Sequence, residues 1–174
     1  MNTTSKLAAF FVVPLITGLL GACSPGALRG YDDDSPFRDG FRLVNTTPFT
    51  TTVGGDNLID VWVTSTAAAD YAKVKLDGSG SGVNLPEGTV IVREVIGASG
   101  EVEKLTMMIK GAPGYFPGGG DWWYGVADPQ GRILPDGDGG LQMGTLEQCG
   151  SCHLTRASDG YLFGVPSDVS PYHQ

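Results

Sequence analysis

Two cysteines and a histidine stand together near the C-terminus, in the segment EQCGSCHL at residues 147–154. Cys149, Cys152 and His153 form a C-x-x-C-H pattern, in which two thiols can form thioethers to a porphyrin while the histidine binds its iron. Thiols at this spacing also occur in structural zinc sites and in redox-active dithiols. The three chemistries make different demands on the rest of the chain.

A structural zinc site needs four ligands, which usually come as two well-separated pairs. The chain has no second C-x-x-C, and its other histidine, His173, is one residue from the C-terminus. A redox dithiol opens a long helix after a buried parallel strand, whereas this motif follows a turn-rich segment. One covalently attached haem c uses all three motif residues, and we expect that cofactor. An exported β-sandwich with a disulfide between Cys149 and Cys152 is the alternative without a cofactor.

The first 22 residues have the pattern of a signal peptide that directs export. Lys6 supplies a positive charge, and the apolar run after it ends in LGAC at residues 20–23. Small residues directly before a cysteine resemble a bacterial lipobox, so we expect Cys23 to be the lipidated first residue of the mature protein. Residues 23–40 predict a flexible tether, and the Asp32–Asp34 run is expected to be a solvated part of it. The expected location is the periplasmic side of a bacterial membrane, reached through the lipid anchor alone.

The composition fits one globular domain over residues 41–174. Of the 174 residues, 41% are hydrophobic, which is enough for a single core. The formal net charge of −8 at pH 7 argues against nucleic acids and anionic lipid headgroups as partners, because these bind Lys- and Arg-rich surfaces. The 27 glycines and 11 prolines predict many turns, as in a strand-rich fold.

Alternating apolar and polar residues predict strands over most of this domain. The expected strands are 58–64, 88–95, 101–110 and 121–127, with a last strand or extended segment at 161–165. Gly97–Gly100 is expected to join the second and third as a hairpin. An alanine-rich helix is expected at 66–76, opened by Ser65 or Thr66. We therefore expect an α+β fold, mainly an antiparallel β-sheet with a few short helices.

The C-x-x-C-H motif is expected on a short helix near the C-terminus. Thr145 and Gln148 match the S/T-x-x-E/Q capping box, in which each side chain bonds the backbone amide of the other residue. The helix would end near Gly160. It would place both cysteines on nearly one face, with the histidine beside them.

Three segments, taken in order, carry a likeness to a known family. They are LPEGTVIVREV at 85–95, GDWWYGVADPQG at 120–131, and CGSCH with a following Asp and YLF at 149–163. These are similar to the DGTV-V-KE strand, the Gly-Asx-Trp-aromatic strand and the C-x-x-C-H helix of the cytochrome P-460 family and its relatives, the cytochromes c′-beta. The resemblance covers about residues 55–165. It implies a largely β fold, often a homodimer, with His153 on the proximal side of the iron and an open distal side.

The chain departs from this family at two positions that the resemblance assigns to the distal side. In cytochromes P-460 a strand lysine is joined covalently to the haem, and a distal carboxylate assists hydroxylamine oxidation. Those positions correspond to Arg93, which stays protonated and is a poor nucleophile, and to Thr155, which cannot accept a proton near neutral pH. The resemblance therefore implies that an open haem binds or processes small nitrogen oxides such as nitric oxide, without hydroxylamine oxidation.

Arg93 is also a pocket candidate on its own pattern. Strand alternation puts it on one face with Ile91 and Val95, an apolar setting that predicts partial burial. From there it can donate to a bound ligand or pair with a haem propionate, the alternative being a surface salt bridge. The three tryptophans are expected to pack mainly in the core, and the PDGDGG run at 135–140 to be a loop rather than a calcium site.

A six-coordinate electron-transfer cytochrome that docks with a redox partner protein is the alternative function. Met107, Met108 and Met143 are the candidate sixth ligands. Met107 and Met108 fall on opposite faces of their strand, so one of them is expected in the core. Met143 lies only six residues before Cys149, which is too close in the chain to reach the far side of the ring.

Overall fold

The fold is built on one antiparallel β-sheet, seen in a computed structural model that describes residues 36–51, 55–79 and 82–172. The strands are β1 (Phe41–Leu43), β2 (Phe49–Thr51), β3 (Gly55–Thr64), β4 (Val90–Ile96), β5 (Val102–Lys110), β6 (Trp122–Ala127) and β7 (Met143–Gly144). The helical segments are α1 (Ala68–Tyr71), α2 (Glu147–Leu154) and the 3-10 turns η1 (Pro36–Gly40), η2 (Pro117–Gly119) and η3 (Ala157–Asp159). A β-sheet with a few short helices confirms the predicted α+β class.

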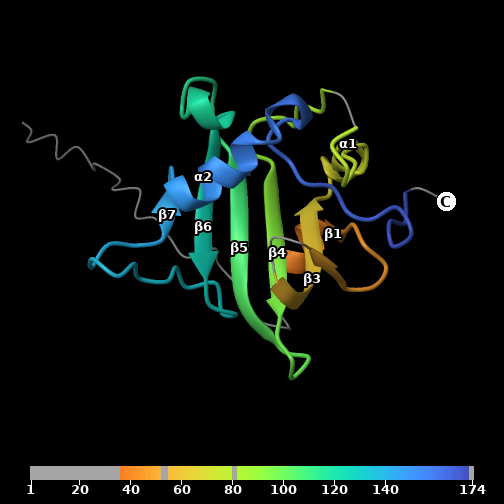
Figure 1. Ribbon diagram of the computed structural model, residues 1–174, viewed down its shortest axis with the longest axis horizontal. Coiled ribbons are helices and arrows are strands. Elements are labelled where there is room, and N and C mark those ends of the chain that lie inside the picture. The colour runs from red at the N-terminus through yellow and green to blue at the C-terminus, as the bar shows by residue number, and fades with distance from the viewer. Residues whose placement is uncertain (1–35, 52–54, 80–81, 173–174) are drawn as a thin grey trace, which may run out of the picture.

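The strands lie in the order β1-β3-β4-β5-β6-β7, with β2 also paired to β3, and all of these pairings are antiparallel. In Figure 1, β3 to β6 are the long central arrows. These four strands were predicted from alternation, and their observed ends lie within three residues of the expected ones. The predicted β4–β5 hairpin is also confirmed, closed by the Gly97 amide donating to the Glu101 carbonyl at 2.9 Å.

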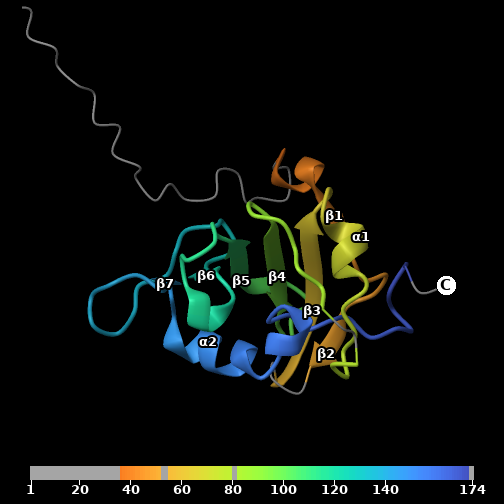
Figure 2. The same ribbon diagram turned by 90° about the horizontal axis from the view of Figure 1, so that it is seen from above.

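Alternation along the strands gives the sheet two apolar faces. One face carries Ile91 and Met108 and packs against α1 and the C-terminal segment; we call it the α2 face. The other carries Val92, Leu105 and Met107 in a separate buried cluster. Figure 2 shows α2 below the sheet and η1 on the opposite side. The side chains that can face α2 are therefore every second residue of β4, β5 and β6.

The predicted helix at 66–76 is only the single turn α1. Its N-cap is Ala67 rather than Ser65 or Thr66, and no side chain caps it. Alanines favour a helix, but tertiary contacts override that preference here. Lys75 pairs with Val165 in an isolated parallel bridge, which requires an extended chain and ends the helix early.

Two strands were not predicted, and one predicted segment, 161–165, does not form a strand. β1 and β2 have three residues each, too few for a period of two to be recognised. Both pair with the long strand β3. Residues 161–165 form no strand: Tyr161 lies in a turn with φ of +66°, and Val165 makes an isolated bridge to Lys75.

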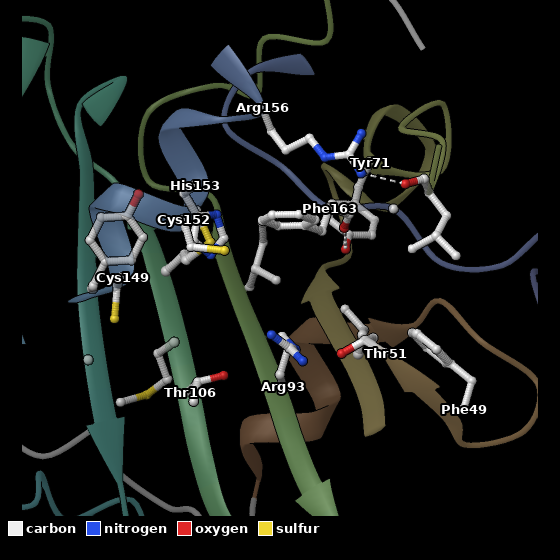
Figure 3. Close-up of a pocket in the computed structure, with 18 of the residues that line it drawn as sticks. Phe49, Thr51, Tyr71, Arg93, Thr106, Cys149, Cys152, His153, Arg156 and Phe163 are labelled. Atoms are coloured by element: carbon white, nitrogen blue, oxygen red, sulfur yellow. Dashed lines mark hydrogen bonds between the residues drawn. The ribbon is translucent and has the colours of Figure 1, made fainter. Parts of the chain in front are cut away.

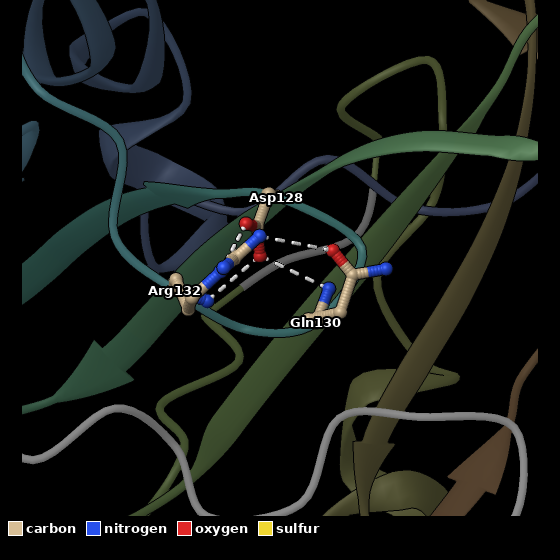
Figure 4. A network of polar contacts seen from close by, with 3 residues as sticks. All are labelled: Asp128, Gln130 and Arg132. Carbon is tan, nitrogen blue, oxygen red and sulfur yellow. Dashed lines mark hydrogen bonds and ion pairs between the residues drawn. The ribbon is translucent and has the colours of Figure 1, made fainter.

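A side-chain network shapes the turn after β6 (Figure 4). Asp128 Oδ1 accepts hydrogen bonds from the amides of Gln130 and Arg132 at 3.0 and 2.9 Å. Arg132 Nε donates to Asp128 Oδ2 at 2.6 Å on the exposed side of the turn. The PDGDGG run is a similar turn, in which Asp136 Oδ1 accepts from two loop amides. Both segments are loops held by their own carboxylates.

The end of the predicted tether belongs to the folded part, because residues 36–40 form η1. Arg38 donates to Glu94 Oε1 at 2.8 Å, and its guanidinium lies 4.8 Å from the Trp62 ring centroid. Trp62 Nε1 donates to the other oxygen of the same buried carboxylate at 2.9 Å. This polar group pins η1 to the sheet side away from α2.

Several predicted features lie outside the described residues. They are the signal peptide, the lipidation site Cys23, the Asp32–Asp34 run and His173. Within the described ranges, no helix combines the length and the apolar character needed to cross a membrane.

Candidate cofactor site

Helix α2 carries the C-x-x-C-H motif, but it is not opened by a capping box. Its N-cap is Leu146, in an extended conformation and without a side-chain cap bond. The predicted Thr145–Gln148 box is wrong, because Thr145 lies one residue before the N-cap. The helix ends at Leu154 instead of near Gly160, since the chain turns into η3 and reaches Gly160 in a left-handed conformation, φ +67°.

Packing holds α2 in place, because eight residues are too few for a stable isolated helix. Gly150 is its buried residue, and a Cβ there would make an ordinary contact with the Phe116 ring at 3.5 Å. Leu146 and Cys149 pack on the core beneath the helix. The motif therefore faces the sheet rather than solvent.

A cavity of about 420 Å³ lies between α2 and the sheet, a size typical of cofactor pockets (Figure 3). Cys149, Cys152 and His153 line it from the helix, and Arg93 lines it from β4. Its apolar and aromatic lining comprises Phe49, Val61, Tyr71, Leu76, Ile91, Met107, Met108, Tyr124 and Phe163. The fold thus brings four of the candidate site residues to one cavity, although Arg93 is distant from the motif in sequence.

The His153 ring is held by a backbone carbonyl and two aromatic rings. Nδ1 lies 2.7 Å from the Tyr161 oxygen, and because a carbonyl only accepts, Nδ1 carries the proton. The ring centroids of Tyr124 and Phe163 lie 5.3 and 5.1 Å away. Burial lowers the pKa of His153 and outweighs the hydrogen bond to Tyr161, which raises it, while the charge of Arg93 adds to the lowering, so the ring is neutral at pH 7. A neutral ring protonated at Nδ1 has Nε2 available for a metal.

The backbone of Gly160 and Tyr161 aims this carbonyl at the histidine. Both residues are left-handed, with φ of +67° and +66°, which in a tyrosine stores about 1–3 kcal/mol of strain. Trp122 Nε1 donates to the Gly160 carbonyl at 2.9 Å, and a Cβ on residue 160 would collide with the carbonyl oxygen of Val83. The sequence pattern did not reveal Tyr161, because it acts through its main chain.

Both motif cysteines are half-buried free thiols, not joined to each other. Burial raises the pKa of Cys149, and the neighbouring Cys152 adds to the effect. In the described part of the chain, no group of three or more His, Cys, Asp or Glu side chains is placed to hold a metal ion. Two separate thiols on one side of a cavity suit bonds to a group inside it.

The charged side chains that line the cavity, within the described residues, are both arginines. Figure 3 shows Arg93 directed into the cavity toward the motif. Its guanidinium has no hydrogen-bond or ion-pair partner in the described chain, and burial lowers its pKa. Arg156 instead donates to the Leu76 carbonyl at 2.8 Å and lies 5.0 Å from the Phe163 centroid. The cavity is therefore positive, which favours a bound group that carries negative charge.

Two buried hydroxyls at the cavity have no hydrogen-bond partner, namely Thr106 Oγ1 and Tyr124 OH. Thr106 is directly opposite Arg93 in the β4–β5 pairing. An unsatisfied buried hydroxyl costs about 1–3 kcal/mol, and it marks a place where a bound group or water supplies the partner. Neither residue was found from sequence, because the strand register that brings them here leaves no local pattern.

Some of the predicted site residues do not reach the cavity. Thr155 is exposed, and its hydroxyl donates to the Cys152 carbonyl at 2.7 Å, which directs it back along the helix. Met143 lies on β7 and is not part of the lining, whereas Met107 and Met108 both are. The three tryptophans pack away from the cavity, as expected for core residues.

No protein-family model and no curated protein sequence matches this chain. Whether its residues fit a covalent haem is therefore decided by the site itself. Two free thiols and a histidine with Nε2 available share one helix, and apolar and aromatic walls enclose the cavity. Thioether attachment, axial coordination and an apolar pocket are what a c-type haem needs, so the residues fit.

Proposed function

We propose that the chain is an exported monohaem c-type cytochrome of the P-460 and c′-beta kind. Cys149 and Cys152 would hold the haem as thioethers, and His153 would be the axial ligand. The observation that supports this best is the hydrogen bond of 2.7 Å from His153 Nδ1 to the Tyr161 carbonyl, since it leaves Nε2 as the coordinating nitrogen. The antiparallel sheet and the position of the motif after it agree with the family resemblance.

The remaining cavity residues have distinct roles in this proposal. A bound haem would supply an iron able to take a small ligand on the side away from His153. Tyr124 and Phe163 pack beside the histidine ring and keep water from it. Val61, Ile91 and Met108 give the sheet wall its apolar character.

The ligand class is taken from the family resemblance, and the polar groups of the sheet wall bear on the hydroxylamine reaction. In the described chain no lysine, aspartate or glutamate lines the cavity. By the resemblance, Arg93 corresponds to the family's cross-linking lysine. A guanidinium that stays protonated does not form such a cross-link. We therefore propose binding or processing of small nitrogen oxides such as nitric oxide, and not hydroxylamine oxidation.

A second candidate function has one observation in its favour. Met108 lines the cavity from the α2 face, and a methionine sulfur is a suitable sixth ligand for haem iron. In that case the protein would transfer electrons to a redox partner and would not bind external ligands.

Export and anchoring are proposed from the sequence pattern around Cys23, which lies outside the described residues. An acyl-modified Cys23 would hold the protein on the periplasmic side of the membrane. That compartment is oxidising. Cysteines bonded to a haem as thioethers would have no free thiol left to be oxidised there.

The absorption spectrum of the reduced protein, matured with the cytochrome c assembly machinery, separates the two functions. A high-spin spectrum that shifts when nitric oxide is added is the expected result. A low-spin spectrum that nitric oxide does not change would establish a sixth protein ligand and favour electron transfer. Met108→Leu then tests whether Met108 supplies it, and Met107→Leu, on the opposite face of the sheet, is the control.

A further inference from the structure

The sheet wall of the cavity contains a pair of hydrogen-bond donors without acceptors. Arg93 on β4 and Thr106 on β5 are register partners, so their side chains project side by side from the α2 face. Neither the Arg93 guanidinium nor the Thr106 hydroxyl has a hydrogen-bond partner in the described chain. Both are among the residues that line the cavity.

The charge of Arg93 is not compensated from any side of this cavity. Among its described lining residues there is no carboxylate. The groups that act on Arg93 electrostatically are the Tyr71 hydroxyl, whose pKa burial raises to about 12, and the Cys152 side chain, and neither of them is a carboxylate. A buried guanidinium without a counter-charge is costly, and an anion that accepts its hydrogen bonds removes most of that cost.

We propose that this site takes a small oxyanion, of the class that includes nitrite, with Arg93 and Thr106 as its donors. The proposal deepens the function proposed above and rests on it for the second contact of the anion, at the haem. A planar guanidinium can bond two oxygens of one oxyanion, and the threonine hydroxyl adds a third donor beside it. A neutral diatomic ligand would leave the charge of Arg93 uncompensated. The site therefore distinguishes ligands by charge.

A comparison of one anionic and one neutral ligand tests this in the haem-loaded protein. Nitrite and nitric oxide are each titrated into the oxidised protein at constant ionic strength, and the dissociation constants are read from the absorption spectrum. Arg93→Gln is expected to weaken nitrite binding about 10–100-fold, the usual value of a charge-assisted hydrogen bond, and to change nitric oxide binding less than about threefold. Thr106→Val is expected to weaken nitrite about 2–10-fold.

The matched control is Arg132→Gln, which removes one positive charge from the exposed turn after β6. Arg132 is 74% exposed and pairs with Asp128, so its loss is expected to leave both affinities within about twofold. An equal loss of nitrite affinity in this variant would show that the net charge of the molecule, and not Arg93, sets the affinity. Equal losses of nitrite and nitric oxide in Arg93→Gln would also overturn the proposal, and they would assign Arg93 to a haem propionate.

A haem-free measurement separates failure of this proposal from failure of the proposed function. Nitrite is expected to raise the Tm of the unmatured wild-type protein, and the shift is expected to be absent in Arg93→Gln and partly retained in Arg93→Lys. If the chain takes up no haem but shows this shift, the anion site stands and the cytochrome proposal fails. If the chain binds haem and nitric oxide but the shift and nitrite binding are both missing, the anion site is wrong.

Discussion

A histidine binds a metal through one ring nitrogen. The hydrogen bond made by the other nitrogen fixes the tautomer and so decides which nitrogen is free to bind the metal. In this chain His153 Nδ1 donates a hydrogen bond to the Tyr161 carbonyl at 2.7 Å and therefore keeps its proton. The carbonyl reaches that position only because Tyr161 adopts a left-handed conformation, φ +66°. The site therefore depends on a strained main chain eight residues beyond the motif as much as on the motif itself.

The haem-free protein should show this arrangement directly. At pH 7 we expect neutral His153 with its proton on Nδ1, because the Tyr161 carbonyl can only accept a hydrogen bond. Long-range ¹H–¹⁵N NMR of the ring nitrogens measures the tautomer, and His173→Gln removes the signals of the second histidine. A proton on Nε2 would contradict the proposed axial role.

The unsatisfied hydroxyl of Thr106 predicts an unusual response to mutation. In the haem-free protein, Thr106→Val should leave the free energy of unfolding unchanged or raise it by up to about 1 kcal/mol, because it removes a buried donor without a partner. The matched control is Thr64, whose Oγ1 donates to the Val90 carbonyl at 3.0 Å and accepts from the Val90 amide at 2.7 Å. Thr64→Val should cost about 1–3 kcal/mol.

Urea unfolding measures both changes from the transition midpoint at equal slope. A loss in Thr106→Val as large as that in Thr64→Val would mean that the Thr106 hydroxyl is satisfied in the folded protein. The hydroxyl would then not mark a ligand position.

At the scale of elements, α2 and the turn that follows it differ in whether their glycines can be replaced by a residue with a Cβ. Gly150 is helical, and a Cβ there would make an ordinary contact with Phe116. Gly160 is left-handed, and a Cβ there would meet the Val83 carbonyl oxygen. The helix that carries the motif can therefore accept a side chain at residue 150, whereas the turn that presents the Tyr161 carbonyl excludes one at residue 160.

The same substitution at the two glycines should therefore have opposite effects. Gly150→Ala should raise the free energy of unfolding by about 0.5–1 kcal/mol through helix propensity, and Gly160→Ala should lower it by about 1–3 kcal/mol or more. Gly88→Ala is the control, since φ is +81° and no atom lies within 4 Å of the added Cβ, so only backbone strain acts. Thermal or urea unfolding would contradict this account if Gly160→Ala were no worse than Gly88→Ala.

Long strands could be predicted from the sequence, whereas short strands and helix starts that depend on tertiary contacts could not. β3 to β6 have six to ten residues each, long enough for alternation to be recognised, and all four were predicted. The three-residue strands β1 and β2 were missed. Both predicted helix starts were wrong, at α1 and at α2, because tertiary packing and not a side-chain cap begins each helix. Local pattern therefore predicted the sheet but not the helix ends.

At the scale of the whole molecule, the sheet brings distant residues to the motif. Cys149, Cys152 and His153 lie within five residues of sequence, so this part of the candidate site could be predicted from sequence alone. Arg93 was a pocket candidate from the family resemblance, with partial burial expected from alternation, and it lines the cavity, whereas Thr106, Tyr124 and the Tyr161 carbonyl were not predicted. Their positions depend on strand register and on a left-handed turn, which one sequence does not show.

The measurement that tests the central claim most directly is the intact mass of the matured protein after denaturation. We expect one haem to remain bound in the wild-type chain, because thioethers at Cys149 and Cys152 survive unfolding. The double variant Cys149→Ala, Cys152→Ala should carry none, while His153→Ala tests the axial role through the spectrum. A wild-type chain that carries no haem and is lighter by the two hydrogens of a Cys149–Cys152 disulfide would contradict the account.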